Sequence, residues 1–431
     1  MPTHPTRRTL LTAGAGTLTG TLALSACGGF STDPDSGTTR DDDTLTMITW
    51  AGDAELTAFR ALADAFAAQG GPRVELQVVP YSEVLTAVDT ALRTDSPPDL
   101  FRVSYTDVAA YRAQGVLANL PDPGSLESSF LPAFWGAVTD DEGTFGVPHH
   151  TDTSMVLVNT GAVASAGLGA LPATLDAAWT WEQFLDAAGR VRPSRADTYP
   201  FAVNWQNAGA FRWLNFVDQA GGRLLTPGLD DVAEDDPGLL EALTFTRDFF
   251  RRGLVPQASS SRGQPASDLF VNQTVAMVFA GDFLLQEIDG AGFEYQATFL
   301  PRDVNASADL GGNALVAVEA GSRKEAALDF LEFCAGAEQM GAFCAAATVL
   351  PTRTDVDPAD LDYAVRPDLM PLFVEQARAI RTELVEQVVV PDFSAVNGQL
   401  ADRLDAAFLS GDDDPAALAQ IVAGVRSVLT P

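Results

Sequence analysis

Hydrophobic residues in the first part of the chain alternate between the two-residue period of strands and the three- and four-residue spacing of helices. Residues 44–50 show the strand period, and the apolar residues of 56–66 show the helix spacing. The same pair of patterns returns at 74–79 and 85–92, and a third strand is predicted at 99–103. Strands that alternate with helices predict a parallel α/β sheet.

The rest of the chain continues with strands and helices in a less regular order. Residues 155–158 form a continuous apolar run, which predicts a buried strand, and a second strand-like run covers 274–280. A Ser/Thr-x-x-Glu/Gln pattern predicts helix starts at Thr180 and Ser322. Asp236, which precedes a proline, predicts another helix start. Three amphipathic helices are predicted around residues 373–385, 400–408 and 418–428.

Polar side chains gather where the predicted strands begin or end. A patch with two histidines, an aspartate and three hydroxyl residues occupies 149–154, directly before an apolar strand. The loops at 50–53, 80–83 and 104–107 each place an aromatic or hydroxyl residue beside a carboxylate. Ligands of open α/β sheets bind beyond the carboxyl ends of the strands. We therefore expect these four segments to line a ligand site.

The N-terminal residues predict export. Residues 1–26 have the form of a lipoprotein signal peptide, with a twin-arginine start, an uncharged stretch too short to span a bilayer, and Leu-Ser-Ala directly before Cys27. Cys27 would then carry the lipid that anchors the protein to the outer face of the cell membrane. The alternative is a Sec-type signal with an accidental cysteine. Residues 27–43 are rich in Gly, Ser, Thr and Asp, which predicts a flexible tether.

Length and charge limit the possible classes of protein. The chain has 431 residues, of which 46% are hydrophobic, so it is long enough for two domains with well-formed cores. When the two arginines of the signal are removed from the 26 basic residues, 24 remain against 58 acidic ones, a net charge of −34. Such a surface repels nucleic acid and anionic lipid, so no nucleic-acid partner is expected.

The few cysteines and histidines do not have the spacing of a metal centre. Cys334 and Cys344 would lie about 15 Å apart on one straight helix, too far for a disulfide. A break near Gly336 or Gly341 would bring them together, so a disulfide and a pair of small core residues both remain open. Adjacent histidines at 149 and 150 point to opposite sides of an extended chain. We expect neither a metal nor a cofactor.

Short motifs follow one another along the chain in a recognisable order. They are Ile48-Thr49-Trp50, Pro97-Pro98-Asp99-Leu100-Phe101, Gly115-Val116-Leu117-Ala118-Asn119-Leu120, Phe145-Gly146-Val147-Pro148, Leu157-Val158-Asn159, Thr180-Trp181-Glu182, Gly221-Gly222-Arg223-Leu224-Leu225, Val275-Ala276-Met277, Gly311-Gly312-Asn313-Ala314-Leu315 and Leu350-Pro351-Thr352-Arg353. Each motif alone is weak. Their joint order, over about residues 44–390, resembles the extracellular solute-binding proteins of family 1, the sugar-type class that serves ABC importers.

The resemblance implies an α/β protein with the two-lobed, periplasmic-binding-protein-like fold of type II, in which a ligand cleft lies between lobes joined by a hinge. The implied N-terminal lobe comprises residues 44–152 and 282–336, and the implied C-terminal lobe comprises residues 153–281 and 337–431. The chain would cross between lobes near 153–159, near 280–282 and after the helix that follows Ser322.

The function that the resemblance implies is binding and not catalysis. The protein would capture a mono- to oligosaccharide outside the membrane, as a monomer, and deliver it to the transmembrane subunits of an ABC permease by hinge closure. A sugar presents C–H faces that stack on aromatic rings and hydroxyls that need fixed polar partners. The aromatic candidates are Trp50, Tyr81 and Tyr105 in the first lobe, and Trp205, Trp213 and Phe283 in the second lobe or hinge. The polar candidates are Asp53, Glu83, Asp107, His150, Asp152, Asp282, Asn313 and Arg353.

Other roles remain open for these residues. A tryptophan in an α/β protein is more often a core residue than a ligand platform, and Asp53 has the alternative role of capping the first helix. Arg353 also suits a carboxylate or phosphate, which keeps open the same fold with a glycerol-phosphate-type compound or a peptide as ligand. An exported glycoside hydrolase is a further alternative, because it also uses carboxylates and aromatic rings.

Overall fold

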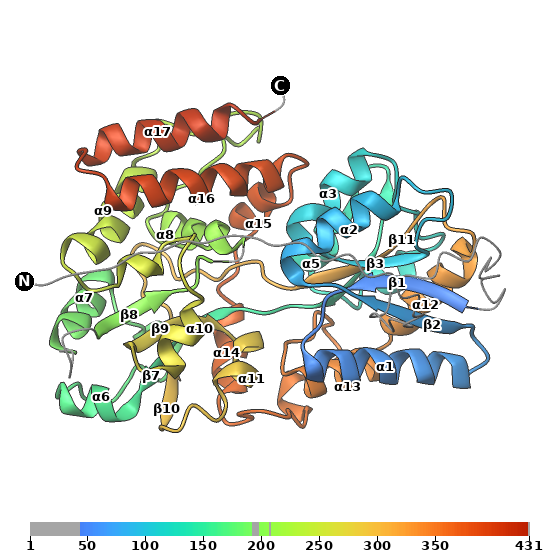
Figure 1. Cartoon of the computed structure of the whole chain (residues 1–431), viewed down its shortest axis with the longest axis horizontal. Helices are drawn as coiled ribbons and strands as arrows, with labels where there is room; N and C mark the ends of the chain where they lie inside the picture. The colour runs from blue at the N-terminus through green and yellow to red at the C-terminus, as the bar shows by residue number, and fades with distance from the viewer. Residues whose placement is uncertain (1–43, 192–197, 207, 430–431) are drawn as a thin grey trace, which may run out of the picture. The chain divides into compact units, whose positions relative to one another are not determined.

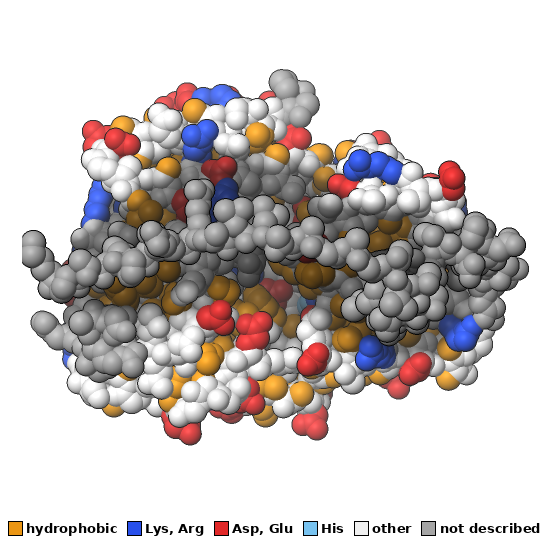
Figure 2. All heavy atoms as spheres, viewed as in Figure 1, with side chains coloured by type: hydrophobic (Ala, Val, Ile, Leu, Met, Phe, Trp, Pro, Cys, Tyr) orange, Lys and Arg blue, Asp and Glu red, His pale blue; other side chains and the backbone are white. Residues whose placement is uncertain are grey.

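The computed structural model describes residues 44–191, 198–206 and 208–429. The predicted signal peptide, the tether and Cys27 lie outside these ranges. Among the described helices, none combines the length and the apolar composition that a membrane crossing requires. Asp and Glu side chains are scattered along both edges of the face drawn in Figure 2, as the excess of acidic residues leads one to expect.

The first sheet has the strand order β2-β1-β3-β11-β6. Its strands are β1 (Thr44–Thr49), β2 (Arg73–Val78), β3 (Leu100–Ser104), β6 (Val147–His150) and β11 (Asn313–Ala317). Strand β1 pairs in parallel with β2 and β3, which confirms the predicted parallel arrangement for these three strands. Strand β11 comes from much later in the chain and pairs antiparallel with β3 and β6, so the complete sheet is mixed.

The second sheet has the strand order β10-β7-β9-β8. Its strands are β7 (Ser154–Asn159), β8 (Tyr199–Val203), β9 (Val275–Gly281) and β10 (Tyr295–Thr298). Strand β7 pairs antiparallel with β9 and β10, and β8 pairs in parallel with β9. The predicted apolar strands at 155–158 and 274–280 are therefore the two central strands of this sheet. A separate hairpin joins β4 (Thr139–Asp140) to β5 (Gly143–Thr144).

Helices cover both sheets (Figure 1). Those associated with the first sheet are α1 (Asp53–Ala68), α2 (Val84–Ala91), α3 (Tyr105–Ala113), α4 (Gly124–Glu127), α5 (Pro132–Gly136), α12 (Lys324–Cys334) and α13 (Ala337–Ala347). Those associated with the second are α6 (Thr160–Ser165), α7 (Trp181–Arg190), α8 (Leu214–Gln219), α9 (Pro237–Arg251), α10 (Ala266–Val271), α11 (Leu285–Ile288), α14 (Met370–Ala377), α15 (Thr382–Val388), α16 (Phe393–Leu409) and α17 (Asp414–Arg426).

The predicted helix starts agree with the structure at two of three places. Thr180 caps α7, because its hydroxyl oxygen accepts a hydrogen bond from Gln183 N. The side-chain oxygen of Gln183 accepts in turn from Thr180 N, as a capping box requires. Asp236 caps α9 by accepting from Gly238 N. The predicted capping box at Ser322 is wrong, because α12 begins one residue later, after Arg323, without a side-chain cap.

The chain passes between the sheets at three places. The outgoing crossing, residues 151–153, joins β6 to β7, and the returning crossing, residues 299–312, joins β10 to β11. These two crossings run side by side, since Thr151 Oγ1 donates to the carbonyl oxygen of Gly311 at 3.1 Å. A third crossing, residues 355–362, leads from Thr354, which bonds Ser129 O, to Tyr363 in the core of the second sheet.

The predicted lobe boundaries differ from these crossings. Residues 282–298 belong with the second sheet, because β10 pairs with β7 and the helix α11 packs in the same core. The predicted return at 280–282 is therefore wrong, and the return is residues 299–312. Residues 337–354 belong with the first sheet, because α13 packs against α1. Cys334 and Cys344 are free, buried thiols in that core, consistent with the core-residue alternative.

Candidate functional site

Two aromatic side chains follow the carboxyl ends of strands in the first sheet. Trp50 comes directly after β1, and Tyr81 begins a short turn of helix after β2. Their ring centroids lie 5.2 Å apart in an edge-to-face arrangement. Trp50 is half-buried, and Tyr81 is 42% exposed as a whole residue, although protein atoms are packed around its hydroxyl group. The pair therefore presents aromatic surface to solvent at the edge of the sheet where ligands are expected.

Arg102 lies beneath this aromatic pair. Its guanidinium carbon is 4.3 Å from the centre of the Trp50 ring, and its Nη1 donates to the carbonyl oxygen of Trp50 at 2.7 Å. Its Nη2 forms a 2.6 Å ion pair with Glu55, in the first turn of α1. The carboxylate of Glu55 also accepts from Gly52 N, which caps that helix. Trp50 is thus held from below by a buried ion pair.

The polar patch that precedes β7 is buried. The pKa of His149 is lowered to about 3, mainly by burial and also by the charge of Arg102, so the ring is neutral at physiological pH. The same causes hold the pKa of His150 well below its usual value. His150 Nε2 lies 3.1 Å from the side-chain amide of Asn313 on β11. Both predicted polar residues, His150 and Asn313, therefore lie in the contact network of Arg102.

Two carboxylates lie at one edge of the second sheet, where β7 begins and β9 ends. Asp152 is in the outgoing crossing, and burial raises its pKa to about 6 although Arg212 acts in the opposite direction. Asp282 follows β9 and accepts from the backbone N–H groups of Thr153 and Phe283 at 3.3 and 3.0 Å. Burial, reinforced by the charge of Asp152, raises the pKa of Asp282 well above its usual value. One oxygen of each carboxylate is buried without a hydrogen-bond partner.

Arg212 and Asp309 form the polar centre of the second lobe. Asp309, in the returning crossing, accepts from Arg212 Nε at 2.9 Å and from Asn215 Nδ2 at 3.4 Å. It also accepts from the backbone N–H and the hydroxyl of Ser154, at 3.1 and 3.2 Å. Arg212 in turn lies 3.8 Å from Asp152. Asp309 therefore holds the first residue of β7 and the arginine together.

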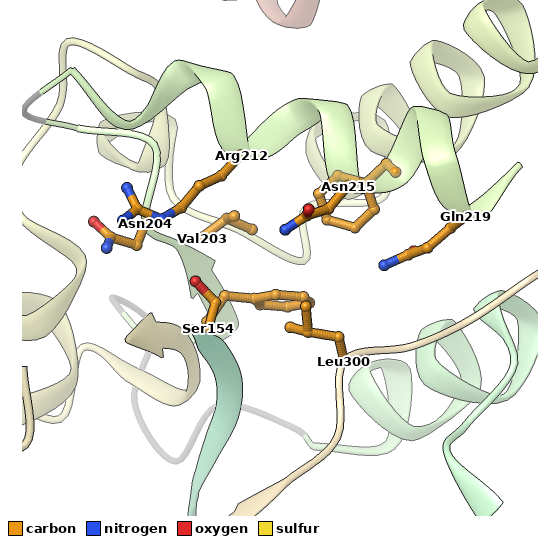
Figure 3. Close-up of a pocket in the computed structure, with 9 residues that line it drawn as sticks. Ser154, Val203, Asn204, Arg212, Asn215, Gln219 and Leu300 are labelled. Atoms are coloured by element: carbon orange, nitrogen blue, oxygen red, sulfur yellow. The ribbon is translucent and has the colours of Figure 1, made fainter. Parts of the chain in front are cut away.

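A small cavity lies beside this group, between α8 and the start of β7 (Figure 3). It is lined by Ser154, Val203, Asn204, Arg212, Asn215, Phe216, Gln219, Phe279 and Leu300. Its volume of about 10 Å³ admits about one water molecule. Asn215 Oδ1 and Gln219 Nε2 are buried without partners, so a water or a hydroxyl group there would meet one acceptor and one donor.

The two sets of residues lie near each other. The pKa of Tyr81, from the first lobe, is raised by burial and by the charges of Asp107 and Asp152, and Arg212 acts against them. Phe283 packs against the cores of both sheets, and its ring lies 5.7 Å from the Arg212 guanidinium. Phe211, next to Arg212, contributes a further aromatic face at 4.8 Å. Phe211 and Phe283 of the second lobe therefore lie beside Arg212, and Tyr81 of the first lobe lies within reach of the charges of Arg212 and Asp152.

A family model described as bacterial extracellular solute-binding protein matches residues 61–370. This chain belongs to that family. The match covers most of the chain and confirms the predicted family of extracellular solute-binding proteins.

Relatives within and around the family agree with this assignment. The diacetylchitobiose binding protein DasA of Streptomyces coelicolor is 24% identical over 359 residues, which cover 77% of this chain and 79% of DasA. An ABC transporter solute-binding protein of Thermotoga lettingae, bound with α-D-tagatose, superposes with a TM-score of 0.74 at 22% identity, over 90% of this chain and 100% of its own. Maltose-bound MalE3 of T. maritima gives a TM-score of 0.73 at 20% identity, over 90% and 100% of the two chains. The predicted two-lobed α/β fold is confirmed.

Several predicted site residues have other positions in this member of the family. Trp205 and Trp213 are buried in the core of the second lobe, where Trp205 stacks on Phe408 and Trp213 Nε1 donates to Thr246. Both rings are at most 1% exposed, so neither offers a face to a ligand in this structure. Tyr105 is also buried, and its hydroxyl donates to the carbonyl oxygen of His150.

Arg353, predicted as a ligand-binding residue with an anion as the alternative ligand, is already paired with a carboxylate in this structure. Its Nε and Nη2 donate to both carboxylate oxygens of Asp355 at 2.7 Å, and its Nη1 donates to Ala335 O at 2.7 Å. Such a bidentate pair uses the same fork that would hold a phosphate. Asp53 is exposed at the start of α1, where Gly52 is the cap, so the capping role weighed for Asp53 is wrong. Glu83 is exposed in the turn after β2.

Asp107 lies at a contact between the lobes. It is in the first turn of α3, which packs against α16 of the second lobe. Burial raises its pKa to about 6, opposed by hydrogen bonds from Ser394 of α16 and from Thr106. Its charge acts on Tyr81, so it lies near the Trp50–Tyr81 pair. It also connects the lobes, through the contact of α3 with α16.

Three central residues were not predicted from the sequence. Arg102 is a charged residue inside an otherwise apolar strand, and this irregularity is the signal that would have identified it. Arg212 stands between two aromatic residues in a stretch already rich in Trp and Phe. Asp309 carries no local signal, because its partners are distant in sequence.

Proposed function

We propose that this protein captures a carbohydrate outside the membrane and delivers it to an ABC permease, without chemical change to the sugar. The observation that carries the proposal is that Phe211 and Phe283 of the second lobe lie beside Arg212, whose charge, together with that of Asp152, also acts on Tyr81 of the first lobe. Trp50, Tyr81 and Phe283 supply faces for the C–H surface of a sugar ring. Asp152 and Asp282 each retain a buried carboxyl oxygen for a hydroxyl group.

The electrostatics favour a neutral, polyhydroxylated ligand. Arg102 is paired with Glu55, and Arg212 is paired with Asp309 and lies near Asp152. An anionic ligand would have to compete with these carboxylates in a protein of net charge −32. A hydroxyl group makes no such demand, because it both donates and accepts a hydrogen bond.

The relatives support the same class of ligand. Their names and titles refer to diacetylchitobiose, tagatose and maltose. These molecules are mono- and disaccharides, so they do not fix the number of rings that this chain binds.

Delivery would follow hinge closure about the three crossings, with the closed form presented to the transmembrane subunits of the permease. We infer that Cys27 carries a lipid that holds the protein at the outer face of the membrane after twin-arginine export. The protein would act as a monomer, because each chain has its own pair of lobes.

A thermal-shift screen tests the proposal. The protein from Gly28 onward, without lipid, is heated with mono-, di- and oligosaccharides, polyols, glycerol phosphates and short peptides. A ligand present at a hundred times its dissociation constant adds about 2.7 kcal/mol to the free energy of unfolding. We expect one class of sugar to raise the melting temperature, and chromatography to recover that sugar uncleaved.

Other outcomes would replace the proposal. If only phosphorylated compounds shift the melting temperature, the carbohydrate assignment is wrong. Arg353→Gln would then show whether Arg353 binds the anion. The substitution abolishes the shift only if Arg353 leaves Asp355 to bind the phosphorylated compound. A cleaved sugar would identify an exported glycoside hydrolase, which needs two carboxyl groups across the scissile bond.

A further inference from the structure

Arg102 is a buried charge in the centre of a sheet. It is 2% exposed and lies on β3, between the apolar residues Phe101 and Val103. Removing a guanidinium from water costs several kcal/mol unless good partners replace the water. Within the described residues, the fold provides such partners for Nη1 and Nη2 through Glu55, the Trp50 carbonyl and Asn313, and leaves Nε buried without one. The two terminal nitrogens therefore fix the position of the guanidinium.

The contacts of Arg102 with Trp50 fix both parts of that residue. The hydrogen bond from Nη1 holds the Trp50 backbone, and the guanidinium plane supports one face of the indole at 4.3 Å. The other face and the edge remain for further contacts, and the Tyr81 ring, with its centroid 5.2 Å away, takes up part of that surface. The indole is therefore restricted to one orientation before any ligand arrives.

Arg102 also connects Trp50 with the start of β11. The Asn313 amide fits this group when its oxygen faces Arg102 Nη2 at 3.1 Å and its nitrogen faces Gly312 O at 3.2 Å. In that orientation the same oxygen also lies 3.1 Å from His150 Nε2. His150 ends β6 at the outgoing crossing, and Asn313 begins β11 at the returning crossing. The orientation of the indole is thus tied to both adjacent crossings.

We propose that Arg102 is a positioning residue for ligand binding, which acts through Trp50 and does not touch the ligand. The proposal rests on the proposed function, since it requires Trp50 to be a ligand platform. A lysine at this position keeps the charge but lacks the planar fork, so it would hold either the carbonyl oxygen or Glu55, without supporting the indole face.

A double-mutant cycle tests the proposal with the sugar identified by the thermal screen. Calorimetry measures the dissociation constant for the wild type, Arg102→Lys, Trp50→Ala and the double variant. We expect Arg102→Lys to weaken binding about tenfold, and to weaken it no further once Trp50 is already alanine. Equal effects of Arg102→Lys in both backgrounds would overturn the proposal, as would an unchanged affinity in the single variant.

The matched control is Arg247→Lys. Arg247 is buried to a similar degree and paired with Asp414 at 2.7 Å, but it lies between α9 and α17, away from the site. We expect this change to lower the melting temperature as Arg102→Lys does, and to leave sugar affinity unchanged. Loss of sugar affinity in the control as well would assign the effect of Arg102→Lys to general destabilisation.

A readout without ligand separates this proposal from the function on which it rests. The indole N–H resonance of Trp50 is assigned by its loss in Trp50→Phe. We expect Arg102→Lys to shift or broaden that resonance and to leave the resonances of Trp205 and Trp213 in place. An unchanged Trp50 resonance would overturn the positioning role. A perturbed resonance in a protein that binds no sugar would contradict the proposed function alone.

Discussion

Arg212 Nε donates a 2.9 Å hydrogen bond to Asp309 Oδ2, and this bond joins the polar centre of the second lobe to the returning crossing. Asp309 also accepts two hydrogen bonds from Ser154, the first residue of β7. The geometry of the site and the path of the chain between lobes therefore depend on one carboxylate.

Asp309→Asn should destabilise the protein strongly. The carboxylate is almost fully buried, and removing its charge leaves Arg212 with only the more distant Asp152. We expect a loss of about 3 kcal/mol in the free energy of unfolding, measured by urea denaturation. The control is Asp231→Asn, which removes an exposed partner of Arg426 and should cost much less, because an exposed ion pair contributes little to stability. Equal losses in the two variants would contradict the central role of Asp309.

Trp50→Ala and Trp205→Ala should have opposite effects on binding and stability. Trp50 is half-buried at the aromatic pair, whereas Trp205 is 1% exposed and stacks on Phe408 in the core. We expect Trp205→Ala to cost about 3 to 5 kcal/mol of folding free energy. Trp50→Ala should cost much less stability and weaken sugar binding strongly, to a dissociation constant that calorimetry still measures. A Trp50→Ala protein that keeps wild-type affinity would exclude Trp50 as a platform.

The stability of the protein should fall as the pH rises through the titration of Asp107. Its folded pKa of about 6 lies above the ordinary value of 3.8, so the folded state binds the proton more tightly than the unfolded state between these values. Stability relative to Asp107→Asn is then greatest below about pH 4 and declines until about pH 6. We expect the difference to change by roughly 2 to 3 kcal/mol over that window.

Urea titrations of both proteins at several pH values provide the measurement. Asp152 titrates in the same range and contributes to both curves, so only their difference reports on Asp107. Parallel curves would show that Asp107 is solvated and does not connect α3 with α16.

Gly312→Ala should destabilise the returning crossing. Gly312 has a φ of +94°, and a Cβ there would lie 2.3 Å from the carbonyl oxygen of His150. Both the left-handed backbone and the contact oppose a side chain, so we expect a loss of at least about 2 kcal/mol. The control is Gly136→Ala, at the end of α5, where an added Cβ meets nothing within 4 Å. Unfolding curves that coincide for the two variants would contradict the close approach of the crossings.

The first-lobe strands and helices follow from the sequence because their patterns are local. The predicted strands at 44–50, 74–79 and 99–103 differ from the observed ones by a residue at most at each end. The lobe boundaries do not follow in the same way. Strand β10 is short, and β11 pairs antiparallel with a strand some two hundred residues earlier, which no local period reports.

The site could be predicted only where a residue adjoins a recognisable strand end. Trp50, Tyr81 and Asp152 meet that condition. The rings of Trp50 and Tyr81 are in contact, and Asp152 lies 3.8 Å from Arg212. Trp205 does not adjoin such a strand end. Whether its ring is buried depends on helices from the far end of the chain that pack on it, such as α16. The ligand-binding prediction for Arg353 did not take account of its neighbour Asp355. This carboxylate lies only two residues away and pairs with the guanidinium.

Arg102 and Arg212 each have a carboxylate of their own, in a protein whose net charge is −32. The positive charges of these two arginines are therefore balanced locally, and they do not offset the negative potential of the rest of the protein. At physiological salt the resulting field extends about 8 Å from the surface, so it acts on a solute before contact. We expect this field to repel dissolved anions during their approach and to leave neutral solutes unaffected.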